Sequence, residues 1–150
     1  MKDKIKPVLT VILLVFVGVT LIVQIAGEFR SVRPIRLPDG LNVICTHATM
    51  RCPTCLMMAK LTREMLNESF KDAVDSGKII FAEIDYEHPE TSEFCEEYQV
   101  ATASVVLVHV ENGKTIAGVN LADEMWKHVT NPPIFKKVLK EQIESLRGEK

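Results

Sequence analysis

The sequence predicts an α/β domain of four strands and three helices behind one N-terminal transmembrane helix. Three observations support this prediction: an uncharged apolar run near the N terminus, alternating strand-like and helix-like segments after it, and a Cys-x-x-Cys motif between the first strand and the first helix. A chain of 150 residues leaves room for one small domain with a modest core after the apolar run.

The apolar run covers residues 8–26, which contain no charged residue. With its flanks it has about 20 residues, and at about 1.5 Å of rise per residue it spans a hydrocarbon core of about 30 Å. A secretory signal peptide is the alternative, but its apolar stretch has about 7–15 residues and ends at a small-x-small cleavage site, which residues 24–26 do not resemble. We therefore predict a membrane anchor in the lipid bilayer over residues 7–27, after a short basic tail over residues 1–6.

Charge is divided unevenly along the chain. Residues 1–37 carry six basic and two acidic residues, a net charge of +4, which leaves −6 for residues 38–150. An acidic domain argues against nucleic acid as a partner, because phosphate binding needs clustered Lys and Arg. Equal numbers of basic residues flank the apolar run, so their count does not orient the anchor. A short tail before one span favours a cytoplasmic tail, and we predict a single-pass protein of the cytoplasmic membrane with an extracytoplasmic domain.

The first half of the domain follows a linker. Residues 28–39 contain two prolines and no sustained period, which predicts a linker and places the domain at residues 40–150. The apolar residues 41–45 predict a buried strand. From Thr54 onward apolar residues recur at spacings of three and four, which predicts a helix ending at Ser76-Gly77, where glycine suits a left-handed cap.

Further elements follow at short intervals. Residues 78–86 alternate as a second strand does, and Pro89 opens a second helix that runs to about Tyr98. The β-branched residues 105–110 predict a central strand covered on both faces.

The C-terminal third begins with a hairpin signal, Asn112-Gly113, so residues 114–119 are predicted to return antiparallel. Asn131 before a proline suits a helix start, and residues 134–146 have the pattern of a final amphipathic helix. Trp126 is predicted to pack under this helix. The predicted order is β-α-β-α-β-β-α.

The Cys52-Pro53-Thr54-Cys55 motif lies where the first predicted strand gives way to the first helix. Free backbone N–H groups and the positive end of the helix dipole favour a thiolate there, and cysteines in such positions have pKa values of about 3.5–7.5 instead of about 8.5. Cys55 lies on the same helical face and closes a disulfide without distortion. Pro53, with Thr54 beside it, suits the first helical turn. We predict that Cys52 attacks a substrate disulfide and that Cys55 resolves the mixed disulfide.

Two residues before the motif are predicted to support it. Arg51 adds positive potential beside Cys52. His47 lies at the predicted C-terminal end of the first strand, where α/β sheets place their chemistry. It is predicted to stabilise the thiolate or to move a proton, and an ordinary strand-end histidine is the alternative.

A Cys-x-x-Cys motif is also half of a zinc site. A structural zinc site needs two further ligands at matching spacing, and Cys45, Cys95 and the four histidines are not paired at such a spacing. We predict no metal and no cofactor other than the redox-active disulfide. Cys45 and Cys95 are predicted to be inert core thiols, with a second disulfide or an electron relay as the alternative.

Residues 41–119 resemble the thioredoxin superfamily. The resemblance rests on the strand–CxxC–helix unit, the strand ending at Asp85 before a proline-initiated helix, the helix-ending Tyr98-Gln99-Val100 and the turn Asn112-Gly113-Lys114. It implies a thioredoxin-like fold, a central four-stranded mixed sheet with about three flanking helices, and thiol–disulfide exchange. The anchor together with Arg51-Cys52-x-Thr54-Cys55 is also similar to tethered thioredoxin-like proteins identified as nitrophenyl-compound nitroreductase subunits.

The sequence departs from the family pattern at three positions. Ser104 stands where thioredoxins have a cis-proline, Thr46 replaces the buried acid and Arg51 replaces an aromatic residue. A cis bond before a residue other than proline costs about 2.5–4 kcal/mol, so the Ala103–Ser104 bond is expected to be trans or strained. Loss of the proline puts peptide docking in question and leaves more room for a metal beside the two sulfurs.

The predicted function is thiol–disulfide exchange at a membrane, where tethering raises the effective concentration of a membrane partner. The predicted partners are an integral-membrane electron transporter of the DsbD or CcdA kind and a protein or small-molecule disulfide acceptor. One alternative is a module in which Cys52, Cys55 and His47 hold a soft metal or an arsenical. The others are a redox subunit of a membrane nitro-compound or arsenical-handling system, and a membrane adaptor with structural thiols.

Overall fold

The computed structural model describes residues 12–23 and 35–148. Residues 12–23 form a helix, in which the Thr20 hydroxyl donates to the carbonyl oxygens of Phe16, at 3.0 Å, and Val17, at 2.9 Å. The chain divides after Arg33 into two units, and each is described by itself.

The predicted anchor is covered in part by the described residues. No helix within residues 12–23 and 35–148 is both long enough and apolar enough to cross a membrane. The prediction over residues 7–27 extends beyond the described helix at both ends. The tail over residues 1–6 and most of the linker over residues 28–39 also lie outside the described residues.

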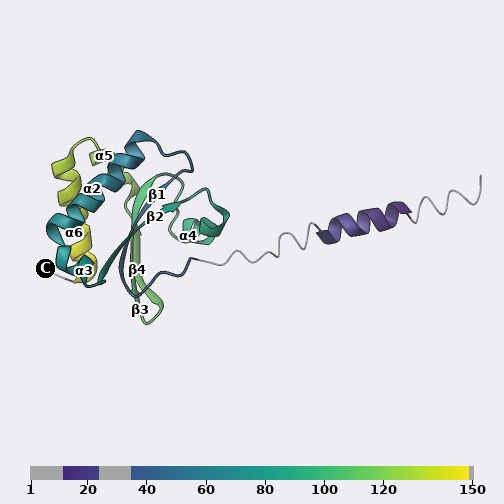
Figure 1. The fold of residues 1–150 in the computed structure, drawn as a ribbon, viewed down its shortest axis with the longest axis horizontal. Helices are drawn as coiled ribbons and strands as arrows, with labels where there is room; N and C mark the ends of the chain where they lie inside the picture. Colours follow the sequence, from purple (N-terminus) through teal and green to yellow (C-terminus); the bar gives the residue numbers. More distant parts are fainter. Residues whose placement is uncertain (1–11, 24–34, 149–150) are drawn as a thin grey trace, which may run out of the picture. The chain divides into compact units, whose positions relative to one another are not determined.

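Four strands form one mixed sheet in the order β2-β1-β3-β4 (Figure 1). Strand β1 (Gly40–His47) pairs in parallel with β2 (Ile79–Asp85) and antiparallel with β3 (Ser104–Glu111). Strand β4 (Lys114–Asn120) pairs antiparallel with β3. The predicted α/β class and four-stranded mixed sheet are confirmed.

The hairpin between β3 and β4 forms where the sequence predicts it. Asn112 and Gly113 both have positive φ, 53° and 70°, as a two-residue turn that matches the twist of the strands requires. Strand β3 is buried along almost its whole length, because it lies second from the edge and helices cover both faces. The prediction of a doubly covered central strand is confirmed.

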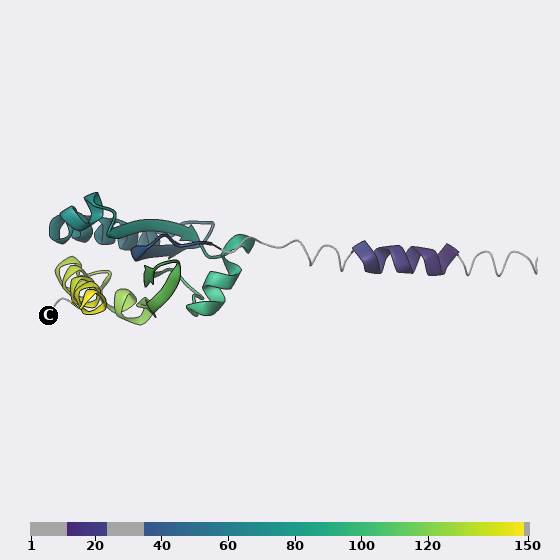
Figure 2. The ribbon, with the colours of Figure 1, turned by 90° about the horizontal axis from the view of Figure 1, so that it is seen from below.

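Helices cover the two faces of the sheet unequally (Figures 1 and 2). The helical elements are α2 (Pro53–Ser69), α3 (Lys71–Asp75), the 3₁₀ turn η1 (Pro89–Thr91), α4 (Ser92–Glu97), α5 (Ala122–His128) and α6 (Pro132–Arg147). On one face α2 and α6 lie side by side, with α3 next to α2 and α5 next to α6. Helix α4 lies on the other face.

Each face of the sheet has its own apolar core. The larger core packs Val43, Val105 and Leu107 of the sheet against side chains of α2 and α6 such as Met65 and Phe135, all of which are almost fully buried. The smaller core lies under α4 and contains Ile44, Phe94, Val100, Val106, Val108 and Val110. Since β1 contributes to both cores, its position and its last residues are firmly fixed.

The described domain contains more helices than the predicted three. The sequence predicts one helix from Thr54 to Ser76-Gly77, whereas the structure breaks it at Phe70, which has φ −134° and ψ 23°. Leaving the helical conformation lets the Phe70 ring enter the core, with the Arg147 guanidinium 5.7 Å from its centre. Helix α5 is also absent from the prediction, although its acidic first turn and basic last turn suit the helix dipole.

Candidate active site

Cys52 and Cys55 form a disulfide at the start of α2. Their Cα atoms are 5.1 Å apart, within the ordinary range for such a bond. Cys52 is the N-cap residue, with extended backbone (φ −77°, ψ 157°), and its Sγ accepts a hydrogen bond of 3.0 Å from the Cys55 backbone N–H. The structure therefore brings the two predicted cysteines together where the sequence places them.

The two sulfur-bearing residues differ in exposure. Cys52 is half-buried, whereas Cys55 is buried, with 9% of its surface exposed. An incoming sulfur therefore has freer access to Cys52. This difference suits the predicted roles, in which Cys52 attacks and Cys55 resolves, and those roles stay a prediction.

The first turn of α2 favours negative charge on Cys52. Pro53 occupies the first helical position, where a missing N–H costs nothing, and α2 has no acidic residue in its first turn. Thr54 is half-buried, and within the described part of the chain its side chain makes no hydrogen bond. The free N–H groups of the first turn and the positive end of the helix dipole therefore favour a thiolate on Cys52.

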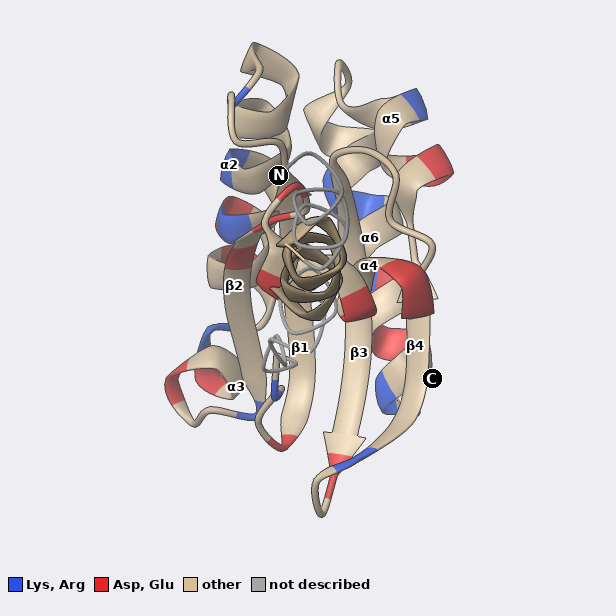
Figure 3. Ribbon diagram, turned by 90° about the vertical axis from the view of Figure 1, so that its right-hand side faces the viewer, with Lys and Arg blue, Asp and Glu red and all other residues tan. Residues whose placement is uncertain are grey.

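Arg51 is bound by two neighbouring side chains. One terminal nitrogen of its guanidinium lies 2.5 Å from Glu83 Oε2 on β2, and the other donates to His47 Nε2 at 2.8 Å. Glu83 also binds Arg63 of α2, at 2.5 Å through its second oxygen. Figure 3 shows charged residues of both signs where α2 and β2 run side by side. The carboxylate offsets much of the positive potential that the sequence assigns to Arg51.

The imidazole of His47 has no free nitrogen to offer the sulfurs. Its Nδ1 lies 2.9 Å from the carbonyl oxygen of Ala48, and its Nε2 faces the Arg51 guanidinium. A carbonyl accepts and a guanidinium donates, so the ring is assigned as neutral with its proton on Nδ1. His47 holds Arg51 in place, and the structure does not bring it to Cys52 or Cys55 as a thiolate partner.

The loop between β1 and Cys52 is attached to the end of β2. The Thr49 hydroxyl donates to Asp85 Oδ2 at 2.7 Å, and the Thr49 N–H donates to Glu87 Oε2 at 2.9 Å. The Thr49 hydroxyl, with help from the Glu87 backbone N–H, lowers the pKa of Asp85 below its ordinary value. The ionised Asp85 carboxylate therefore binds the loop to the end of β2 through Thr49.

Ser104 begins β3 opposite Thr46, and the two residues form the last pair of the β1–β3 ladder. No peptide bond among the described residues is cis, so the Ala103–Ser104 bond is trans. The Ser104 hydroxyl is buried and bound to Asn120 Oδ1. The Ser104 side chain therefore links β3 to the end of β4, and the strained Ala103–Ser104 bond considered from the sequence is absent.

The two remaining cysteines are free thiols on opposite faces of the sheet. Burial raises the pKa of Cys45 on β1 from 9.0 to about 12, so it stays protonated and unreactive at neutral pH. Burial also raises the pKa of Cys95 on α4, whose sulfur lies 3.7 Å from the Tyr86 carbonyl oxygen. Their separation excludes the predicted alternative of a disulfide between these two residues.

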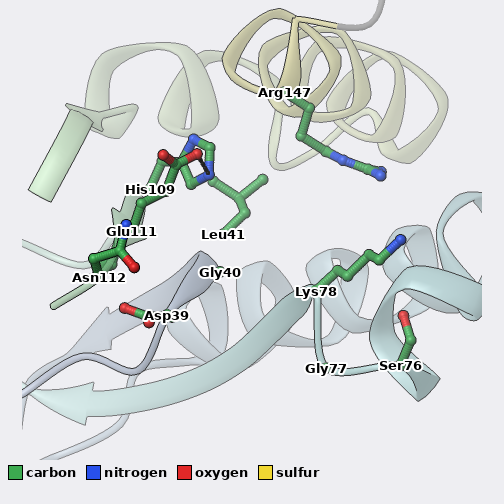
Figure 4. Close-up of a pocket in the computed structure, with 11 residues that line it drawn as sticks. Asp39, Gly40, Leu41, Ser76, Gly77, Lys78, His109, Glu111, Asn112 and Arg147 are labelled. Carbon is green, nitrogen blue, oxygen red and sulfur yellow. Dashed lines mark ion pairs between the residues drawn. The ribbon is translucent and has the colours of Figure 1, made fainter. Parts of the chain in front are cut away.

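The described residues contain no group of three or more His, Cys, Asp or Glu side chains arranged to hold a metal ion. A cavity of about 560 Å³ lies at the opposite end of the sheet, lined by residues such as Lys78, His109 and Glu111, the last two forming an ion pair of 3.4 Å (Figure 4). This cavity borders the first residues of β1 and the last of β3, so it is distant in topology from Cys52.

Sequence reasoning missed Glu83. A charged residue within the otherwise apolar segment Ile79–Ile84 was the available signal, because a charge on the helix-covered face of a strand needs partners. Its partners, Arg51 and Arg63, come from other segments, and no short-range pattern pairs them.

The strand order, the single parallel pairing and the cysteine pair at the start of α2 define a thioredoxin-like fold. No protein-family model and no curated protein matches the sequence.

Solved structures similar to this chain include three thioredoxins. They are the oxidised mitochondrial thioredoxin 3 of Saccharomyces cerevisiae, 20% identical over 77% of this chain and 89% of that chain with a TM-score of 0.41; chloroplastic thioredoxin z, 17% identical over 63% and 80% with a TM-score of 0.35; and Fasciola hepatica thioredoxin, 19% identical over 61% and 80% with a TM-score of 0.36. Since these identities and TM-scores are low, the assignment of a thioredoxin-like fold rests on the strand order and on the cysteine pair at the start of α2.

The burial of Cys45 predicts selective alkylation of the reduced, folded chain. At pH 8 iodoacetamide should modify Cys52 and leave Cys45 unmodified, because the pKa of Cys45 is about 12 in the fold and the thiolate is the reactive form. Mass spectrometry of peptides gives the extent at each cysteine. In denaturant Cys45 should react fully, and equal modification of both residues in the folded chain would contradict the assignment.

The same shift predicts a dependence of stability on pH. The unfolded thiol loses its proton near pH 9.0 and the folded thiol near pH 12, so the unfolded state binds fewer protons in this interval and the free energy of unfolding falls as pH rises through it. Denaturant titrations of the Cys45→Ala chain should show a flatter pH dependence above pH 9 than the unsubstituted chain.

Proposed function

We propose that the chain is a thiol–disulfide oxidoreductase that works through Cys52 and Cys55. The observation that carries this proposal is the disulfide across the N-cap of α2, with Cys52 more accessible than Cys55. Such a pair exchanges two electrons with other thiols, and the start of a helix stabilises the thiolate that this chemistry needs.

The reaction proceeds in two exchanges. The Cys52 thiolate attacks one sulfur of an acceptor disulfide, and a mixed disulfide forms as the first acceptor thiolate leaves. The Cys55 thiolate then attacks Cys52 Sγ, closes the internal disulfide and releases the second acceptor thiolate. The dithiol loses two electrons and two protons, and the acceptor disulfide gains them. The same two exchanges in reverse, with a donor dithiol, return the Cys52–Cys55 disulfide to the dithiol form.

Residues 7–27 are proposed to anchor the protein in the cytoplasmic membrane with the domain outside the cytoplasm. The uncharged run over residues 8–26 supports this. Within the described helix the Thr20 hydroxyl returns to backbone carbonyls, as a polar side chain in hydrocarbon requires. The proposed electron source is an integral-membrane transporter of the DsbD or CcdA kind, and the proposed acceptor is a disulfide, with no cofactor besides the protein's own.

The other functions considered from the sequence receive no specific support. A soft-metal module would need a third ligand, and both nitrogens of His47 are engaged. The narrower similarity to nitroreductase subunits remains a hypothesis about the acceptor.

Redox equilibration tests the proposed function. The detergent-solubilised chain is equilibrated in metal-free glutathione buffers, and the remaining thiols are alkylated and mapped by mass spectrometry. We expect one reversible disulfide, Cys52–Cys55, with a potential between about −270 and −120 mV. Failure of this pair to cycle, with Cys45 and Cys95 as controls that stay reduced, would remove the basis of the proposal.

The anchor is tested by extraction. Membranes from cells that produce the full chain are washed with alkaline carbonate, which releases peripheral proteins and leaves integral ones. We expect the full chain in the pellet and a chain lacking residues 1–34 in the supernatant. Release of the full chain by carbonate would contradict the anchor and leave the redox chemistry untouched.

A further inference from the structure

The turn before β3, residues 98–103, lies at the same end of the sheet as the disulfide. Ser104, where β3 begins, pairs with Thr46 near the end of β1, and the chain continues from His47 through a four-residue loop to Cys52. Figure 3 shows the start of α2, the start of β3 and helix α5 at this end. Ala101 and Thr102 in the turn are exposed, so a molecule that approaches the disulfide also meets this backbone.

Asn120 binds the first part of the turn. Its Nδ2 donates to the carbonyl oxygens of Tyr98, at 3.0 Å, and Gln99, at 3.2 Å. Its Oδ1 accepts from the Ala122 N–H, at 3.0 Å, and from the Ser104 hydroxyl. One side chain at the end of β4 thereby ties the turn to β3 and to α5.

Trp126 binds the last part of the turn. Its indole Nε1–H donates to the Ala103 carbonyl oxygen at 2.7 Å and to Thr102 Oγ1 at 3.1 Å. The Thr46 hydroxyl donates to the Thr102 carbonyl oxygen at 3.1 Å. The sequence predicts that Trp126 packs under the final helix. In the structure it is instead 42% exposed and faces the turn with its polar edge.

These contacts occupy backbone acceptors of the turn that would otherwise be open to an extended peptide. Such a peptide pairs with an exposed edge through free backbone C=O and N–H groups. The Thr102 carbonyl accepts from the Thr46 hydroxyl, and the Ala103 carbonyl accepts from both the Trp126 indole and, at 3.1 Å, the Thr102 hydroxyl. A peptide that pairs with Ala103 must first displace the Trp126 indole, and hydrogen bonds exchanged in this way give little net gain.

We propose that Trp126 is a specificity-determining residue that closes this backbone to peptide pairing, so that acceptor disulfides are recognised at their sulfur atoms and low-molecular-weight disulfides react as readily as disulfides carried on a peptide. The inference rests on the proposed thiol–disulfide exchange and names the class of its acceptor. Trp126 acts through the Ala103 carbonyl and takes no part in the electron transfer itself.

Two acceptors with the same reacting bond test the inference. One is the mixed disulfide of N-acetylcysteine amide with thionitrobenzoate. The other carries the same mixed disulfide on the central cysteine of a nine-residue extended peptide. The reduced, detergent-solubilised full chain is mixed with each, and release of the coloured thiolate gives two second-order rate constants. Their ratio, peptide over small acceptor, cancels any change in thiol reactivity.

The Trp126→Phe variant keeps an aromatic ring and removes the N–H donor. We expect a ratio near unity for the unsubstituted chain and a ratio about 3- to 10-fold higher for Trp126→Phe, with the rate for the small acceptor unchanged. Ile116→Ala, at a 59% exposed position on β4, serves as the surface control and should keep the ratio of the unsubstituted chain.

Each other outcome overturns the inference. A ratio well above unity in the unsubstituted chain would show that peptides already pair there. An unchanged ratio in Trp126→Phe, or an equal slowing of both acceptors, would show that the indole has a structural role alone. If the unsubstituted chain reduced neither acceptor, the proposed function itself would fail. This result differs from the preceding ones, in which both acceptors are still reduced.

Discussion

The contact on which this site depends is between the positive end of α2 and the sulfur of its N-cap residue. Cys52 accepts the Cys55 N–H in the position that a Ser or Asp side chain occupies in many helices. A thiolate that accepts such a bond is favoured by the same dipole and free N–H groups. The larger core fixes the direction of α2 against the sheet, and the direction of the dipole is fixed with it.

The surroundings hold this contact in place. Glu83 and His47 bind Arg51 immediately before the cysteine, and Asp85 binds Thr49 earlier in the loop. On the other side of the site, the side chains of Asn120 and Trp126 bind the turn before β3. Several hydrogen bonds thus supply the rigidity that a proline gives the turn in the family that the sequence resembles.

Much of the fold was predictable because its signals are local. A two-residue turn such as Asn112-Gly113 has few compatible conformations, and β-branched runs and the Cys-x-x-Cys spacing have similarly restricted interpretations. The break at Phe70 was not predictable, because the helical pattern continues through it and the ring leaves the helix for a tertiary contact. The contacts of Glu83 with Arg51 and of Trp126 with Ala103 were not predictable for the same reason, since each pair is distant in the sequence.

Trapping the mixed disulfide tests the central claim most directly. The Cys55→Ser chain is reduced, mixed with a small disulfide and analysed by intact mass and peptide mapping. The account predicts a stable adduct of one acceptor half on Cys52, because the resolving thiol is gone and Cys45 is buried and protonated. Absence of an adduct, or an adduct on Cys45 or Cys95 with Cys52 unmodified, would contradict it.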